Sequence, residues 1–195
     1  MLPDLTPATR RMTGLLAGCG DDQLKAPSPC TDYTLGDLVD HVSGIGVGFA
    51  AAAAKDIGAI TAQAPQPDAS RLEPDWRTAI AARLEALAAA WRDPAAWTGM
   101  TQVGGVDLPG EVAGLVCLTE LTVHGWDIAV SSEQAYAPAD DELGAVLQFL
   151  TAMCEPDQAA ARSAIFGPVV PVPAGAPLLD RVIGLSGRDP SWRAG

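Results

Sequence analysis

The sequence is poor in basic residues, aromatic residues and histidines. Twelve lysine and arginine residues stand against 24 aspartate and glutamate residues, so the formal net charge is −12. Nucleic-acid phosphates and anionic lipid surfaces attract basic patches, so this charge argues against a nucleic-acid partner and against a membrane partner. Aromatic residues make up only 5% of the chain and hydrophobic residues 48%. Much of that hydrophobic fraction is alanine, which favours helix.

Paired cysteines are also missing, because Cys19, Cys30, Cys117 and Cys154 form no Cys-x-x-Cys motif. We expect reduced thiols in a cytoplasmic protein. The start of the chain, Met1 to Asp4, lacks the basic and apolar segments of a signal peptide. Cys30 lies in a proline-containing loop, where it is either a reactive thiol or an exposed or packed bystander.

Apolar residues recur at helical spacing along most of the chain. They predict helices over residues 4–18, 34–56, 74–93, 109–132 and 138–155, a short helical turn at 159–164 and a last helix at 177–186 with Gly187 at its end. Residues 98–109 predict a short hairpin or an ordered loop, and the proline-rich segment 168–177 predicts extended chain. The fold class is therefore all-α, a helical bundle, and the length suits a single domain, 1–195.

The most informative stretch runs from Leu118 to Asp127, inside a long apolar segment. Glu120 and His124 are four residues apart, so on a helix they are neighbours on one face. Asp127 follows His124 by three residues on the same stripe. A buried carboxylate is costly unless it is paired or binds a metal, so the pair is either a Glu–His hydrogen bond in a core or two ligands of a divalent metal.

The second histidine, His41, supplies a possible third ligand. Thr34 and Asp37 form a variant of the capping box that begins a helix, and His41 lies at the edge of that helix's apolar stripe. Two histidines and a glutamate are a ligand set of catalytic zinc sites, in which a fourth position is left for water or substrate. Outside the ligands, Asp127 either orients His124 or pairs with an arginine, and Asp37 either supports His41 or acts only at the helix start.

Several motifs together carry a family resemblance. They are DLVDHVSG around His41 with PCTDYT before it, TELTVHGWDIA around Glu120 and His124, and the tail segments FGPVVPVP and GRDP. The chain resembles the mycothiol-dependent metal-binding family of the DinB-like superfamily, which includes the N-terminal domain of mycothiol-dependent maleylpyruvate isomerase. The resemblance implies a DinB-like four-helix bundle with a short extra C-terminal helix, and a zinc or nickel ion held by His41, Glu120 and His124.

The resemblance also implies mycothiol as the thiol cosubstrate. We expect an enzyme that transfers this thiol to an electrophilic small molecule or uses it to isomerise one. The alternative is a metal-binding helical bundle without catalysis, acting in sensing or protein interaction. A third reading is a metal-free bundle with a Glu–His core pair. A homodimer is a further expectation, because bundles of this kind often pair through helix faces.

Overall fold

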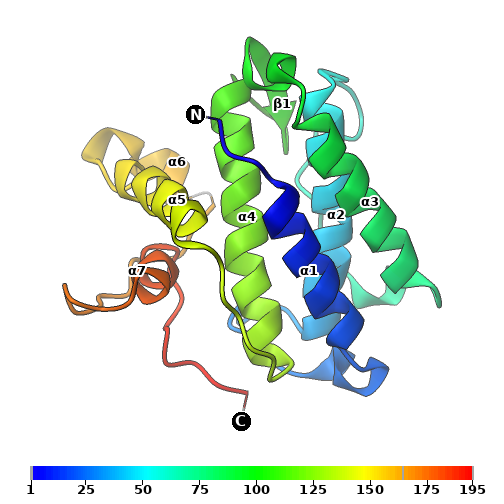
Figure 1. Ribbon diagram of the computed structural model, residues 1–195, viewed down its shortest axis with the longest axis vertical. Helices are drawn as coiled ribbons and strands as arrows, with labels where there is room; N and C mark the ends of the chain where they lie inside the picture. Colours follow the sequence, from blue (N-terminus) through cyan, green and yellow to red (C-terminus); the bar gives the residue numbers. More distant parts are fainter. Residues whose placement is uncertain (1, 164, 195) are drawn as a thin grey trace.

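The computed structural model describes residues 2–163 and 165–194. Within these ranges the chain is mostly helical, with seven α-helices and a single two-stranded sheet (Figure 1). The helices are α1 (Thr6–Gly18), α2 (Leu35–Ala53), α3 (Trp76–Ala90), α4 (Gly110–Ser131), α5 (Asp140–Ala152), α6 (Ala159–Ser163) and α7 (Leu178–Leu185). The strands are β1 (Met100–Val103) and β2 (Val106–Pro109).

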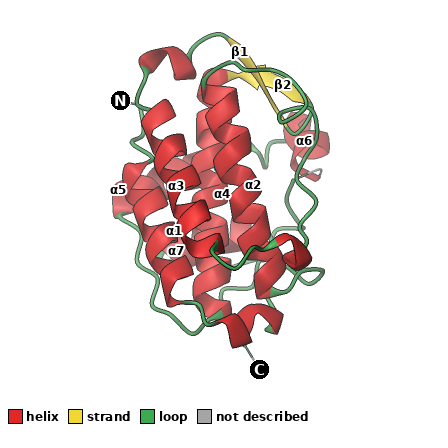
Figure 2. Ribbon diagram, turned by 90° about the vertical axis from the view of Figure 1, so that its right-hand side faces the viewer, coloured by secondary structure: helices red, strands yellow, loops and turns green. Residues whose placement is uncertain are grey.

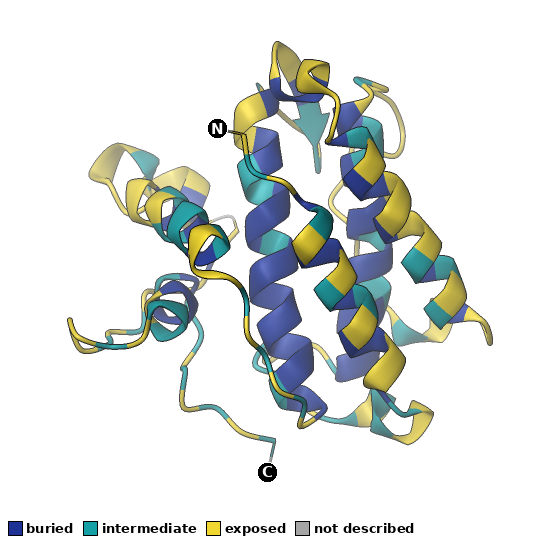
Figure 3. Cartoon of the chain, viewed as in Figure 1, coloured by how far each residue is buried: buried dark blue, intermediate teal, exposed yellow. Residues whose placement is uncertain are grey.

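Helices α1 to α4 lie side by side with their long axes in similar directions (Figures 1 and 2). Both α1 and α2 pack against α3 and α4. Helix α4 is buried along most of its length (Figure 3), because α5 and the β-hairpin also contact it. A helix that is apolar on nearly all sides is stable only when enclosed in this way. Ionisable groups on α4 are therefore placed inside the protein.

The start of α2 confirms the predicted capping box. The Asp37 backbone N–H donates to Thr34 Oγ1 at 3.2 Å, and the Thr34 N–H donates to Asp37 Oδ2 at 2.9 Å. The other oxygen, Oδ1, accepts a bond of 2.8 Å from the Ala69 N–H. Asp37 thus satisfies free backbone donors at the helix N-terminus and fastens the loop that follows α2.

The small sheet corrects the all-α prediction. Residues 98–109 form a hairpin in which Met100 pairs with Pro109 and Val103 with Val106. Its turn is Gly104–Gly105, with φ of +58° and +82°. Two positive φ values are what a tight hairpin turn requires, and glycine adopts them without steric cost.

Helix boundaries differ by a few residues from the predicted ones. Helix α3 begins at Trp76, so Pro74 precedes the helix, and α5 is shorter than predicted at both ends. The predicted turn at 159–164 is α6, except that Ala164 lies outside the described residues. No helix among the described residues is long and apolar enough to cross a membrane.

The end of α7 directs the chain back toward α4. Gly187 has φ of +87°, its N–H donates to Gly184 O, and the Arg188 N–H donates to Ile183 O, both at 3.1 Å. This pair of bonds is a Schellman motif, which ends a helix with a left-handed residue. The sequence predicted Gly187 at this helix end. The next residue, Arg188, extends its side chain to Asp127 of α4.

Candidate metal site

Three ionisable side chains from two helices meet at one point. His41 comes from α2, and Glu120 and His124 come from α4. Glu120 Oε2 lies 3.3 Å from His41 Nε2 and 3.2 Å from His124 Nε2. One ligand atom from each residue falls within 4.8 Å of the other two. The helical spacing of Glu120 and His124 explains one of these contacts, and the packing of α2 on α4 explains the other.

The spacing of these atoms suits a small cation. Tetrahedral zinc bonds nitrogen and oxygen at about 2.0–2.2 Å, which puts its ligand atoms about 3.3–3.5 Å apart. The two measured N···O distances are close to that separation. They are also compatible with protonated histidines that donate to Glu120, which is the core-pair reading of the sequence.

Asp127 holds the other nitrogen of His124. His124 Nδ1 lies 2.9 Å from Asp127 Oδ2, and the Asp127 side chain is fully buried. Burial raises the pKa of Asp127, but the Arg188 charge and the His124 hydrogen bond lower it below its ordinary value. An ionised carboxylate only accepts hydrogen bonds, so His124 Nδ1–H is the donor. In a neutral His124 the lone pair is then on Nε2, which faces Glu120.

His41 has no such support. Its Nδ1 is buried and has no hydrogen-bond partner within residues 2–163 and 165–194. Its Nε2 contacts Glu120, and its ring meets the His124 ring edge-on at 4.8 Å between centroids. Among the described residues, the hydrogen-bonding contact of the His41 ring is therefore the one to Glu120.

The two histidines also control the charge of Glu120. Burial opposes ionisation of this carboxyl, but hydrogen bonds from His124 and His41 hold its pKa well below the ordinary value. Burial likewise lowers the pKa of His124, but its bonds to Asp127 and Glu120 raise it well above the usual value. Without a metal ion, therefore, a proton on His124 supplies the positive charge that the two carboxylates need.

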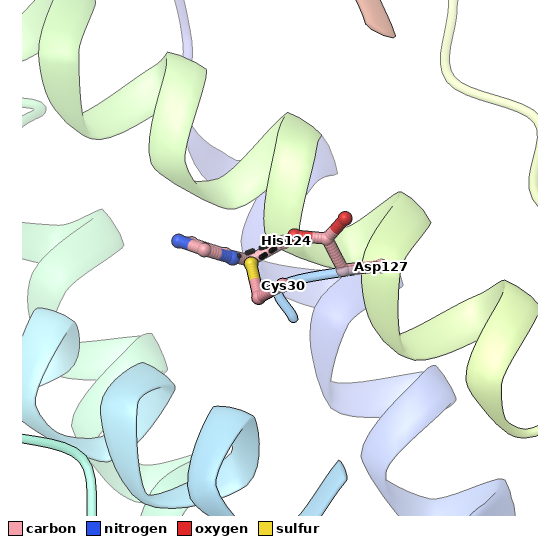
Figure 4. Close-up of side chains that lie close together, drawn as sticks. All are labelled: Cys30, His124 and Asp127. Atoms are coloured by element: carbon pink, nitrogen blue, oxygen red, sulfur yellow. Dashed lines mark hydrogen bonds and ion pairs between the residues drawn. The ribbon is translucent and has the colours of Figure 1, made fainter. Parts of the chain in front are cut away.

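Cys30 and Arg188 complete the surroundings of Asp127. The Cys30 thiol donates to Asp127 Oδ2 at 3.5 Å (Figure 4), and the Arg188 guanidinium contacts the same oxygen at 3.1 Å. Arg188 also donates to Cys30 Sγ at 3.1 Å. Cys30, His124 and Asp127 are close enough together to hold an ion. However, the Arg188 cation already neutralises this second cluster, so it supports His124 rather than competing for a metal.

The cluster opens onto a cavity of about 860 Å³. His41, Glu120 and His124 line it, and so do Cys30 and Arg188. A cavity of this size holds a small molecule or part of a larger one. A ligand in it has access to all three side chains of the cluster.

Other residues singled out in the sequence lie elsewhere. The oxygens of Asp37 are engaged at the start of α2, and Asp37 is in neither cluster. Cys117 is fully buried, and burial raises its pKa, so it packs as a neutral thiol. Arg188 was missed as a site residue. Its sequence signals were the GRDP motif, which the resemblance includes without a role for the arginine, and the preceding glycine, which marks a helix end but gives no direction for the side chain.

The fold and the cluster define a helical protein with a His–Glu–His group beside a cavity. Residues 5–129 match the family model of the mycothiol maleylpyruvate isomerase N-terminal domain, and the chain belongs to this family. His41, Glu120, His124 and Asp127 all fall within the matched residues, whereas Arg188 lies beyond them.

Two uncharacterized proteins of Mycobacterium tuberculosis, from strains CDC 1551 / Oshkosh and ATCC 25618 / H37Rv, are each 34% identical over 125 residues. The match covers 62% of this chain and 61% of the length of either relative.

Crystal structures of mycothiol-dependent maleylpyruvate isomerase and of a histidine-to-alanine mutant of it share the fold. Each has a TM-score of 0.59 and 18% sequence identity. The match to the isomerase covers 80% of this chain and 69% of the isomerase chain. The match to the mutant covers 75% of this chain and 65% of the mutant chain.

Proposed function

We propose that this protein is a metal-dependent, mycothiol-using enzyme that acts on an electrophilic small molecule. The observation that carries the proposal is the approach of His41 Nε2 and His124 Nε2 to one oxygen of Glu120, at 3.3 and 3.2 Å, beside a cavity. Family membership supports mycothiol as the thiol. Isomerisation, the activity in the name of the structural relatives, and transfer of the thiol to the substrate are the two reactions that we propose.

In this proposal His41, Glu120 and His124 hold a divalent ion, zinc in preference to nickel. When bound, such an ion lowers the pKa of a coordinated thiol, so that the thiol is held as thiolate. Asp127 fixes the ring of His124 and keeps its Nε2 lone pair free, and Arg188 in turn fixes Asp127. The cavity beside the cluster would hold the substrate next to the bound thiol.

We propose that α1 to α4 form a DinB-like four-helix bundle within a single domain, 1–195. The mutual packing of these helices, with α1 and α2 both against α3 and α4, supports this description. The cavity beside the cluster favours an enzyme over a metal site of purely structural or sensory use, in which a fourth protein ligand would close the site.

The first test is the metal content of untagged protein, measured by elemental analysis. We expect about one equivalent of zinc or nickel in the wild type and its loss in His41→Ala and His124→Ala, with helicity retained by circular dichroism. Cys154→Ser, a change at an exposed cysteine, is the control and should keep the metal. A wild type that takes up no metal after incubation with zinc or nickel would refute the proposal and leave the core-pair reading.

A further inference from the structure

The cavity walls away from the cluster are predominantly apolar. The hairpin, which packs on α2 and α4, contributes Val103, Val106 and Leu108. Helix α2 contributes Ile45 and Phe49, and the loop after it contributes Ile60. The hairpin is fastened to this loop by a bond of 2.7 Å from the Gly105 N–H to Thr61 O. Hairpin and loop therefore form one connected wall of the cavity, near β1 and β2 in Figure 2.

Part of this apolar wall is open to solvent. Val106 is 63% exposed and Ile60 is 55% exposed, and both line the cavity. Ile165, at 48%, and Tyr33, at 38%, add further exposed apolar surface around it. Large apolar side chains that stay exposed around a concave site mark a surface that binds an apolar ligand.

The charges around the cavity do not suit an anionic substrate. Among the described lining residues, Arg188 is the one lysine or arginine. Its charge is already paired with the buried Asp127, and four of its five N–H groups donate, two to Asp127, one to Cys30 Sγ and one to Ser186 O. Asp32 and Glu120 add negative charge to the lining. In the proposed enzyme, Glu120 and the thiolate together balance the charge of a divalent ion. No cation is left to pair with a carboxylate on the substrate.

We propose that the electrophile is an uncharged, apolar molecule rather than a carboxylic acid such as maleylpyruvate. The inference rests on the proposed function and specifies its substrate class. Addition of the thiol across an electron-poor carbon–carbon double bond breaks the S–H bond and the π bond, forms one C–S bond and one C–H bond, and consumes no oxidant. Displacement of halide from an activated ring forms the C–S bond, breaks the C–halogen bond and releases the halide with the thiol proton.

Binding tests the substrate class without requiring turnover. The uncharged 1,3-dinitrobenzene and the anionic 3,5-dinitrobenzoate are titrated into the wild-type protein by calorimetry, once with excess mycothiol present and once after chelator treatment. We expect the uncharged compound to bind about tenfold more tightly or better in both preparations, because the cavity offers a carboxylate no lysine or arginine whose charge is free. Equal affinity, tighter binding of the carboxylate, or no binding of either compound would overturn the inference.

A pair of lysine variants tests whether the cavity wall sets this preference. Val106→Lys puts an ammonium on a residue that lines the cavity, whereas Met100→Lys adds the same charge to a residue of β1 that is equally exposed but outside the lining. We expect Val106→Lys to reduce the preference about fivefold or more and Met100→Lys to leave it unchanged. An equal shift in both variants would assign the preference to overall charge and sink the inference.

Turnover separates this inference from the proposed function. Wild-type protein and mycothiol are assayed with 1-chloro-2,4-dinitrobenzene and with 4-chloro-3,5-dinitrobenzoate, each rate divided by the uncatalysed rate. Faster turnover of the uncharged compound supports both proposals, and faster turnover of the carboxylate contradicts the substrate class. Selective binding without any turnover of the uncharged compound would uphold the apolar cavity and count against the proposed transfer reaction.

Discussion

His124 contacts a different carboxylate with each of its ring nitrogens. Nε2 faces Glu120 at 3.2 Å and Nδ1 faces Asp127 at 2.9 Å. The first contact places Nε2 where it can bind a metal ion together with Glu120 and His41. The second contact decides that the proton of a neutral ring is on Nδ1. Removing the charge of Asp127 should therefore affect metal binding even though the proposed ligands are His41, Glu120 and His124.

The substitution Asp127→Asn tests this dependence. We expect zinc affinity to fall about 10–100-fold, because the ring loses the carboxylate that fixes its tautomer and raises its basicity. Affinity is measured by competition with a chromophoric chelator. Ser131→Ala is the control, since the Ser131 hydroxyl donates to the Asp127 backbone carbonyl and contacts no part of the ring. Unchanged affinity in Asp127→Asn, with the fold retained, would contradict the assigned role.

The raised pKa of His124 makes metal binding depend on pH. In the metal-free protein the proton on His124 is retained above the ordinary titration range of histidine, because Asp127 and Glu120 stabilise it. Folding stability from this proton is complete below about pH 6.5 and is lost as the pH rises through the raised value. Metal affinity depends on pH in the opposite direction: it increases as the pH rises over that range, because the metal binds the deprotonated ring.

We expect zinc binding at neutral pH to release about one proton from the cluster. Calorimetric titrations in two buffers with different ionisation enthalpies measure the number of protons. Proton release should decrease as the pH approaches the raised pKa of His124. Binding with no proton release at neutral pH would mean that His124 is already neutral, contrary to the electrostatic argument.

At the scale of elements, the C-terminus of α7 positions Arg188. The Schellman motif needs a left-handed residue at Gly187, and the Gly167 backbone passes directly beside it. A Cβ at Gly187 would lie 2.9 Å from three backbone atoms of Gly167. Both the φ angle and the close approach therefore require glycine, and Arg188 follows immediately.

Gly187→Ala should destabilise the protein by about 2–3 kcal/mol, from positive φ together with the clash. Gly99→Ala is the matched control, because Gly99 has φ of +66° and nothing lies within 4 Å of an added Cβ. Gly99→Ala should lower the free energy of unfolding by about 1 kcal/mol, from the positive φ angle alone. Urea denaturation measures both. Equal losses would show that the segment around Gly167 moves aside freely.

At the scale of the whole molecule, cations can bind in two ways, non-specifically to the surface of a protein with a net charge of −12 or by coordination at the cluster. An acidic surface attracts any divalent cation weakly and does not select for a coordination geometry. The cluster combines one carboxylate with two imidazoles, a set that suits zinc or nickel and not magnesium, which prefers oxygen ligands. Thermal stability distinguishes the two kinds of binding.

Zinc at about 100 times its dissociation constant should stabilise the folded protein by about 2.7 kcal/mol and raise Tm by about 5–10 °C. Chelator should reverse the shift, and magnesium at the same concentration should not reproduce it. The variant His41→Ala should lose most of the shift. An equal response to magnesium would assign the stabilisation to the acidic surface instead of the cluster.

The sequence by itself determined the features that depend on local backbone geometry. Residue types and spacings of three or four residues predicted the capping box of Thr34 and Asp37, the helices and the glycine at the end of α7. The shared face of Glu120 and His124 is of the same kind. Helical periodicity places these residues relative to one another whatever the rest of the chain does.

Only the tertiary structure decided what surrounds that face. His41 precedes Glu120 by 79 residues, Cys30 precedes Asp127 by 97, and Arg188 follows Asp127 by 61. His41 was predicted as a ligand both from its place on a helical stripe and from the resemblance, but no spacing rule relates the other two residues to Asp127. Likewise, a loop was as compatible with residues 98–109 as the hairpin that lines the cavity. Contacts between distant segments are set by how helices and loops pack, and periodicity within one element carries no information about its neighbours.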